Sequence, residues 1–216
     1  WGRVLEGFTE LTPLPVIRPA PRPVDDSVIG DVMTFLGEDE TAALRELAHE
    51  RQLTVNGFVQ AAWALMLYFH SGRDDVLFGV TVAGRPADGP EFEKTVGLFI
   101  SSIPLRVRLP EPAMGRTVAE WLGDLQAQNL AMREHEHLPL VTIAECSELP
   151  RGTPLFDSLF VFESEPVNFS LADGAAGLSA RADSMRTHTN YPLTVVIYPG
   201  DTLGLHYSYD RRFLDD

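Results

Sequence analysis

The 216-residue sequence has little of what several classes of protein require. It contains one cysteine, Cys146, which excludes an internal disulfide framework and a zinc site built from cysteines. The 17 basic residues are outnumbered by 31 acidic ones, and the net charge of -14 argues against binding to nucleic acid or to an anionic membrane surface. No apolar run reaches the roughly 20 residues of a membrane-spanning helix, and no signal peptide is evident, so we expect a cytoplasmic protein.

The sequence also lacks the common catalytic motifs. It has no GxSxG elbow, no phosphate-binding P-loop and no GxGxxG pattern. His135 and His137 are two residues apart, whereas the helical zinc motif needs histidines four apart, so we expect an exposed helix end and no metal site. Cys146 has no evident base partner, and we expect a buried structural thiol there.

Hydrophobic residues make up 44% of the sequence, enough for a substantial core. A proline-rich stretch at 12–24 predicts an extended strap. Apolar runs of strand type are mixed with helical patterns, which predicts an α/β or α+β protein with a mixed β-sheet flanked by helices. The expected strands are 28–35, 76–83, 96–109, 155–162, 193–198 and 203–209, and the expected helices are 38–51, 54–70, 117–134 and 139–145.

The segment from Gly79 to Arg108 joins two apolar runs through a loop rich in glycine, proline and acid. Gly84-Arg85-Pro86 breaks the first run, and the second contains the small residues Gly97, Ser101 and Ser102. Small residues within an apolar strand indicate close approach by another backbone or by a ligand. An internal strand with a bulge accounts for the same pattern, so both interpretations stand.

A second group of polar residues, His188, Thr189 and Asn190, comes just before the expected strand at 193–198. Polar side chains gathered where a strand begins are candidates for a binding site. A histidine that simply meets solvent at a strand end explains the pattern equally well.

Six stretches, taken in order, resemble the condensation domains of nonribosomal peptide synthetases. Each motif is short, but their order and spacing together are specific, and the resemblance extends over nearly the whole chain. They are Trp1–Pro15, FGVTVAGRP (78–86), VGLFISSIPLR (96–106), REHEHLPL (133–140), RGTPLFD (151–157) with Phe162-Glu163, and TNYPL (189–193).

This resemblance implies a chloramphenicol-acetyltransferase-like fold with two lobes around a tunnel. The catalytic HHxxxDG motif of the family is absent, because the sequence holds no pair of adjacent histidines. The chain therefore resembles the C-terminal lobe alone, over residues 1–216, and by itself is predicted to be inactive. Within it the resemblance implies a crossover strap at 1–27, a floor-loop region at 79–108 and a latch region at 150–166.

The implied chemistry is amide formation between a carrier-bound thioester donor and an amine acceptor. The N-terminal lobe would supply the catalytic histidine, and this lobe would supply tunnel wall, floor loop and a docking surface for peptidyl carrier proteins. No metal or directly bound cofactor is implied, since the carriers bring the phosphopantetheine. The resemblance assigns Ser101, Ser102, His188, Thr189 and Asn190 to the tunnel, and Gly84, Arg85, Pro86 and Gly97 to the floor loop. Family members usually have Asn-Thr where this chain has Ser101-Ser102.

Two alternatives share the same fold. The chain could belong to a non-catalytic domain that recruits a carrier protein or a tailoring enzyme, or to an epimerisation domain. The stretch PLFDSLFVFE (154–163) favours condensation over epimerisation. A lobe separated from its partner should also expose an apolar face, detectable by dye binding or self-association.

Overall fold

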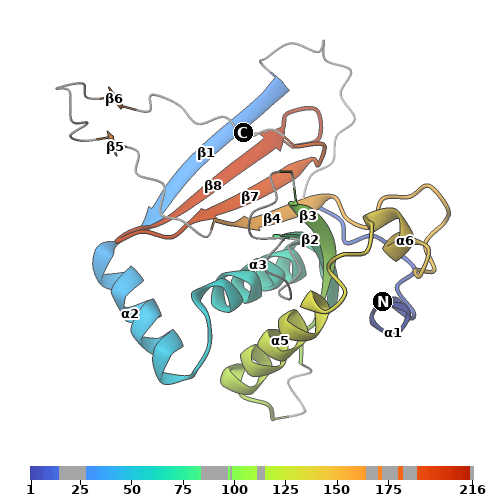
Figure 1. Cartoon of the computed structure of the whole chain (residues 1–216), viewed down its shortest axis with the longest axis horizontal. Helices are drawn as coiled ribbons and strands as arrows, with labels where there is room; N and C mark the ends of the chain where they lie inside the picture. The colour runs from blue at the N-terminus through green and yellow to red at the C-terminus, as the bar shows by residue number, and fades with distance from the viewer. Residues whose placement is uncertain are drawn as a thin grey trace. The chain divides into compact units, whose positions relative to one another are not determined.

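The computed structural model of the chain is drawn in Figure 1. The chain divides into two compact units. The first unit comprises Trp1–Pro15 and Leu44–Phe160, and the second comprises Val16–Ala43 and Val161–Asp216. The described residues are 1–14, 28–83, 97, 99–110, 115–163, 170–171, 180–181 and 189–214.

The first unit has a mixed sheet with helices beside it. Strand β2 (Asp75–Val82) pairs antiparallel with β3 (Ser101–Arg108) and parallel with β4 (Ser158–Phe162), whose last two residues fall in the second unit. Figure 1 shows α3 and α5 next to each other beneath β2 and β3. The helices are α1 (Gly2–Leu5), α3 (Val55–Ser71), α5 (Val118–Arg133) and α6 (Leu140–Ala144). This arrangement confirms the expected α/β class with a mixed sheet flanked by helices.

Alternation along β2 and β3 builds the core of this unit. Because successive strand residues point to opposite faces, every second side chain shares one face. On one such face the paired residues are almost fully buried: Val76 with Val107, Phe78 with Leu105, and Val80 with Ile103. The apolar runs seen in the sequence are therefore strands buried on this face.

Strand β3 has one partner strand in the described part of the chain, and α5 covers its other edge. Trp121 Nε1 donates to the backbone oxygen of Arg108 at 3.3 Å, and Gln128 Nε2 donates to that of Arg106 at 2.7 Å. Alternate residues present their backbone groups to the same edge, so Pro104, which has no N–H, also faces α5. On this edge, side chains of α5 thus donate to the carbonyls of Arg106 and Arg108, and Pro104 has no backbone N–H to pair.

Local capping signals set the ends of two helices, as the sequence predicts. Thr54 caps α3 by accepting from the backbone N–H of Gly57 at 3.1 Å, and α3 ends at Gly72 with a left-handed φ of 68°. Thr117 and Glu120 form the capping box that starts α5. These caps satisfy backbone groups that would otherwise lack partners at the helix ends.

Some expectations about burial and boundaries are wrong. The apolar spacing in the two long helices predicts that Phe69 and Leu130 face inward. Phe69 of α3 is instead 77% exposed and Leu130 of α5 is 59% exposed, because neighbouring elements cover only one stripe of each helix. Strand β3 begins at Ser101 and β4 at Ser158, both later than expected. Leu155 and Phe156 are buried without being in a strand, so their apolar character reports burial and not conformation. Pro139 has an extended ψ of 139° and precedes α6 instead of opening it.

The second unit is built on an antiparallel sheet. Strand β8 (Leu203–Asp210) lies between β1 (Ile29–Leu36) and β7 (Leu193–Tyr198), antiparallel to both. The turn signal Pro199-Gly200-Asp201 between the expected strands 193–198 and 203–209 predicts this β7–β8 hairpin, and the pairing confirms it. Strands β5 (Ser170–Leu171) and β6 (Ala180–Arg181) form a short separate pair. The residues of helix α2 (Glu38–Glu50) fall in both units.

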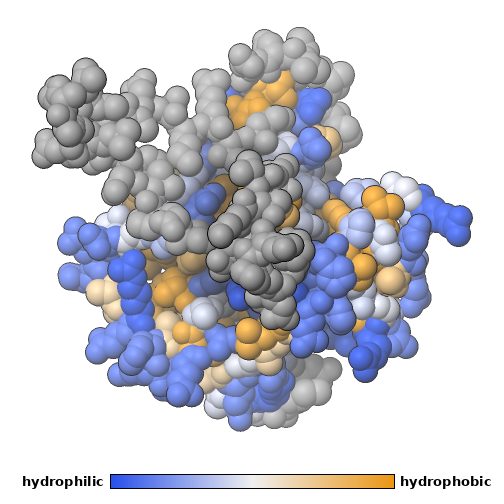
Figure 2. All heavy atoms as spheres, in the orientation of Figure 1, coloured by the Kyte–Doolittle hydropathy of each residue, from blue (hydrophilic) through white to orange (hydrophobic). Residues whose placement is uncertain are grey.

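Apolar side chains reach the surface at several places. Figure 2 shows hydrophobic residues among hydrophilic ones on the viewed face. On β1, Val32 and Phe35 are 49% and 56% exposed, and on α6 Val141 is 74% exposed. Whether such surface binds dye or drives self-association stays a prediction. Within the described residues, no helix combines the length and apolar character needed to cross a membrane.

Gly79 in β2 offers a direct test of the packing. A Cβ atom at Gly79 would lie 2.2 Å from Cε2 of Phe156, a fully buried ring. We expect Gly79→Ala to lower the free energy of unfolding by about 1–3 kcal/mol, because the ring must move in a packed core. Chemical denaturation measures this change.

Gly123→Ala in α5 is the matched control, since a Cβ there meets nothing within 4 Å. It should be neutral or stabilise by about 0.5–1 kcal/mol, because alanine favours helix. Equal effects of the two substitutions would contradict the described packing of Gly79 on Phe156.

Candidate functional site

The two serines expected at the tunnel stand at the first two positions of β3. Ser101 is opposite Val82 and Ser102 is opposite Thr81, and both serines are half-buried. Since neighbouring strand residues point to opposite faces, the two hydroxyls project to different sides of the sheet. At most one serine can therefore face any one side of this strand pair.

Other expected residues in this region are only partly described. Gly84, Arg85 and Pro86 lie outside the described residues. Gly97 is exposed, and a Cβ there would meet Phe99 only at ordinary contact distance, 3.4 Å. Among the described residues, none approaches position 97 closely enough to require glycine there.

Thr189 and Asn190 belong to the second unit, ahead of β7. The Thr189 hydroxyl lies 2.5 Å from that of buried Thr194 and accepts from the backbone N–H of Tyr191 at 3.2 Å, so it has a local structural role. Asn190 is exposed, and its amide has no hydrogen-bond partner among the described residues. His188 lies outside the described residues. The predicted residues therefore form two groups, one in each unit.

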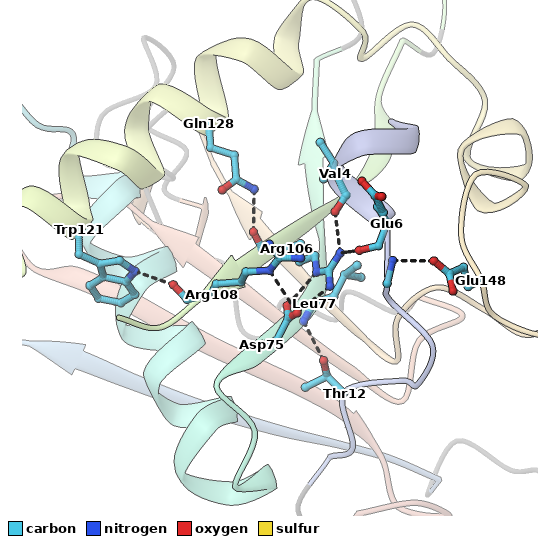
Figure 3. Close-up of polar contacts among 11 residues, drawn as sticks. Val4, Glu6, Thr12, Asp75, Leu77, Arg106, Arg108, Trp121, Gln128 and Glu148 are labelled. Atoms are coloured by element: carbon cyan, nitrogen blue, oxygen red, sulfur yellow. Dashed lines mark hydrogen bonds and ion pairs between the residues drawn. The ribbon is translucent and has the colours of Figure 1, made fainter. Parts of the chain in front are cut away.

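Arg106 makes more side-chain hydrogen bonds than the other residues of this region that the structure describes, although the sequence alone gave it no role. Arg106 of β3 is 5% exposed and makes a bidentate pair with Asp75 of β2, with Nε–Oδ1 at 2.8 Å and Nη2–Oδ2 at 2.6 Å (Figure 3). Its Nη1 donates to the backbone oxygens of Val4 and Glu6, both at 2.8 Å, and its guanidinium lies 5.3 Å from the centre of the Phe8 ring. An arginine inside the apolar run PLRVRL was the available signal.

Further hydrogen bonds hold the described part of the expected strap, residues 1–14, against the first unit. Trp1 Nε1 donates to the backbone oxygen of His135 at 3.3 Å. The backbone N–H of Gly7 donates to Glu148 Oε1, and that of Leu77 donates to Thr12 Oγ1, both at 2.7 Å (Figure 3). With Arg106, these contacts fix the segment along most of its length. Residues 15–27 of the strap lie outside the described residues.

The other candidate side chains show no catalytic arrangement. His135 and His137 are exposed, as expected. Cys146 is also exposed, so the expectation of a buried thiol is wrong: it follows the short helix α6, with only Ile143 of that helix buried. Among the described residues, no group of histidine, cysteine, aspartate and glutamate could hold a metal ion.

Asp157 lies in the expected latch region, 150–166, and is partly removed from solvent. It is half-buried just before β4, and this burial raises the pKa of its carboxyl group above the ordinary value. Gly152, earlier in the same region, takes a left-handed φ of 84°. Residues 164–166 of the latch lie outside the described residues.

Comparison with known proteins identifies the family. The condensation-domain model matches residues 1–215, and the chain belongs to the condensation-domain family. It is 40% identical to one of the linear gramicidin synthase proteins of Brevibacillus parabrevis over 98% of its own length, and 40% identical to chondramide synthase cmdD of Chondromyces crocatus over 99%. It spans only 4% and 5% of those two proteins.

Solved structures agree on the fold. The X-domain from teicoplanin biosynthesis matches all of the chain with a TM-score of 0.79 at 22% identity, and the chain covers 49% of it. A holo four-domain nonribosomal peptide synthetase bound to AMP and glycine also matches all of the chain, with a TM-score of 0.76 at 16% identity and 17% coverage. These likenesses confirm the expected chloramphenicol-acetyltransferase-like fold.

The Arg106 contacts predict a large cost for losing this side chain. Arg106→Met should lower the free energy of unfolding by on the order of 3 kcal/mol, because Asp75 and two backbone oxygens lose their donor. Hydrogen exchange should also speed up at residues 4–8. Arg108→Met is the control: its side chain is 65% exposed and should contribute less than about 1 kcal/mol. Unchanged exchange at residues 4–8 in Arg106→Met would contradict the described role.

The raised pKa of Asp157 predicts a pH dependence of stability. The carboxyl of Asp157 holds its proton more tightly in the folded protein than in the unfolded one. The protonated carboxyl therefore contributes to folding stability, fully below the pKa of the unfolded state, and this contribution is lost as pH rises through the pKa of the folded state. Asp157→Asn should therefore gain stability relative to the original protein as pH rises from about 3 towards neutrality. Urea denaturation across this range measures the difference, and a constant difference would refute the effect.

Proposed function

We propose that the chain is the C-terminal lobe of a condensation domain in a nonribosomal peptide synthetase. The observation that carries this proposal is the family match over residues 1–215 in a chain that spans only 49% of the X-domain it resembles. A second lobe would supply the rest of the domain, including the HHxxxDG histidine that this sequence lacks. The lobe alone is then inactive.

The reaction is the attack of an acceptor amine on the carbonyl carbon of a donor thioester. A C–N bond forms, the C–S bond breaks, and the sulfur leaves as the thiol of the donor phosphopantetheine after taking up the proton lost by nitrogen. The histidine of the other lobe positions or deprotonates the amine, and hydrogen-bond donors stabilise the oxyanion. None of these groups is assigned to the present chain.

This lobe contributes the wall of the tunnel (the channel for the pantetheine arm), the floor loop and a docking surface for carrier proteins. Ser101 and Ser102 are small, half-buried and hydroxyl-bearing, which suits a wall beside a narrow pantetheine arm that needs room and hydrogen bonds. Asn190 offers an exposed amide of the same kind in the second unit. Arg106 acts indirectly, by holding β3 and residues 4–8 together. A cytoplasmic location stays a prediction from composition.

A recruitment role is the second candidate. It is favoured by the likeness to the teicoplanin X-domain in its complex with OxyB, which has a TM-score of 0.77 at 22% identity. In that case the chain would present a docking surface and perform no chemistry. The two candidates differ in whether the complete natural polypeptide forms an amide bond.

Blocking the proposed channel tests the condensation role. In the complete polypeptide with loaded donor and acceptor carriers, Ser102→Phe should slow single-turnover amide formation by ~100-fold, because a misplaced arm loses its attack geometry. Ser102→Ala is the matched control and should retain most of the rate, since it keeps the space. Mass spectrometry of the acceptor carrier measures the product, and melting temperatures exclude unfolding.

Three outcomes separate the interpretations. If Ser102→Phe and Ser101→Phe both react at the original rate, β3 does not line the channel. If the complete polypeptide forms no amide from loaded carriers, condensation is excluded and recruitment is favoured. A loss confined to the phenylalanine variants supports the channel wall.

A further inference from the structure

A cavity of about 350 Å³ lies in the first unit, between α1, the end of β3 and one face of α5. Four arginines line it together with one aspartate and a tryptophan ring: Arg3, Arg106, Arg108, Arg116, Asp124 and Trp121. This concentration of cations is unexpected in a chain whose net charge is -14. The charge around the cavity is therefore local and opposite in sign to that of the chain.

Two of these arginines have their charge satisfied within the protein. Arg106 is bound by Asp75 and two backbone oxygens, and Arg116 forms an ion pair with Asp124. Arg108 reaches the same Asp75 only through Nε, at 3.3 Å, so both of its Nη groups remain available. Four arginines set against the two acids that pair with them, Asp75 and Asp124, leave two arginines without a carboxylate of their own.

Arg3 is the second of these arginines. It has no hydrogen bond or ion pair with any residue that the structure describes, and it is exposed at the cavity. It comes from α1, which the contacts of Arg106 with Val4 and Glu6 attach to the strand that carries Arg108. Arg3 and Arg108 therefore line the same cavity, and hydrogen bonds from Arg106 join the two elements that carry them.

We propose that this cavity binds the phosphate group of a small organic phosphate. Guanidinium groups match phosphate oxygens in a bidentate geometry, and two arginines without a carboxylate of their own match the double negative charge of a phosphate monoester. A monocarboxylate would neutralise only one of them. The volume is within the range of ligand pockets, ~300–1,000 Å³, so there is room for an organic part beyond the phosphate.

The walls indicate where that organic part lies. The indole of Trp121 lines the cavity and is held in place because its Nε1 donates to the backbone oxygen of Arg108. Val4 is partly exposed at the cavity, whereas Trp121 and Leu125 are only 6% and 3% exposed and form its base. An apolar group attached to the phosphate packs against Val4 while the phosphate contacts Arg3 and Arg108.

Residue-resolved chemical protection tests the proposal on the complete natural polypeptide. Phenylglyoxal modifies accessible arginines, and mass spectrometry gives the rate at each position. Inorganic phosphate, and phenyl phosphate more strongly, should slow modification of Arg3 and Arg108 several-fold relative to chloride at equal ionic strength. Arg133, exposed at the end of α5, is the internal control and should be unaffected.

Variants establish that the two arginines bind one anion. Arg108→Gln should abolish the protection of Arg3 by phosphate, whereas Arg133→Gln should leave it intact, with melting temperatures confirming that both variants fold. The proposal is overturned if phosphate protects Arg133 as well as Arg3, if acetate protects as strongly as phosphate, or if no protection appears. It is overturned equally if Arg3 stays protected in Arg108→Gln.

Discussion

The packing of the first unit around its N-terminal segment depends on the buried guanidinium group of Arg106. Arg106 must place its charge and its N–H groups on partners, because a buried charge without them costs several kcal/mol. Its partners come from two parts of the chain: Asp75 in β2, and the backbone oxygens of Val4 and Glu6 in the N-terminal segment. This side chain therefore links the N-terminal segment to the β2–β3 pair beside the cavity, together with the contacts of Trp1, Gly7 and Thr12.

Much of the fold follows from local chemistry that a single sequence displays. The capping box of Thr117 and Glu120 predicts where α5 begins, and Thr54 and Gly72 predict both ends of α3. The break at Pro199-Gly200-Asp201 predicts the β7–β8 hairpin. Each of these signals acts over a few residues, so no knowledge of distant parts of the chain is needed to interpret it.

The features of the fold that the sequence did not predict depend on contacts between residues far apart in the chain. The exposure of Leu130 and Phe69 is decided by which stripe of each helix its neighbours cover, and periodicity does not identify that stripe. Arg106 meets Val4 across 102 positions, so its role could not be inferred from its own surroundings. The resemblance located Ser101 and Ser102, which do open β3, but their place in a channel remains a prediction.

The closed edge of β3 also limits how partners can bind. An extended peptide joins a sheet by pairing its backbone with an open strand, and this mode needs free carbonyls and N–H groups. On β3 the carbonyls of Arg106 and Arg108 are taken by α5, and Pro104 has no N–H to offer. Along residues 104–108 this edge therefore offers few free backbone groups, so a partner that binds there is recognised mainly through its side chains. Such binding depends on the sequence of the partner more than backbone pairing does.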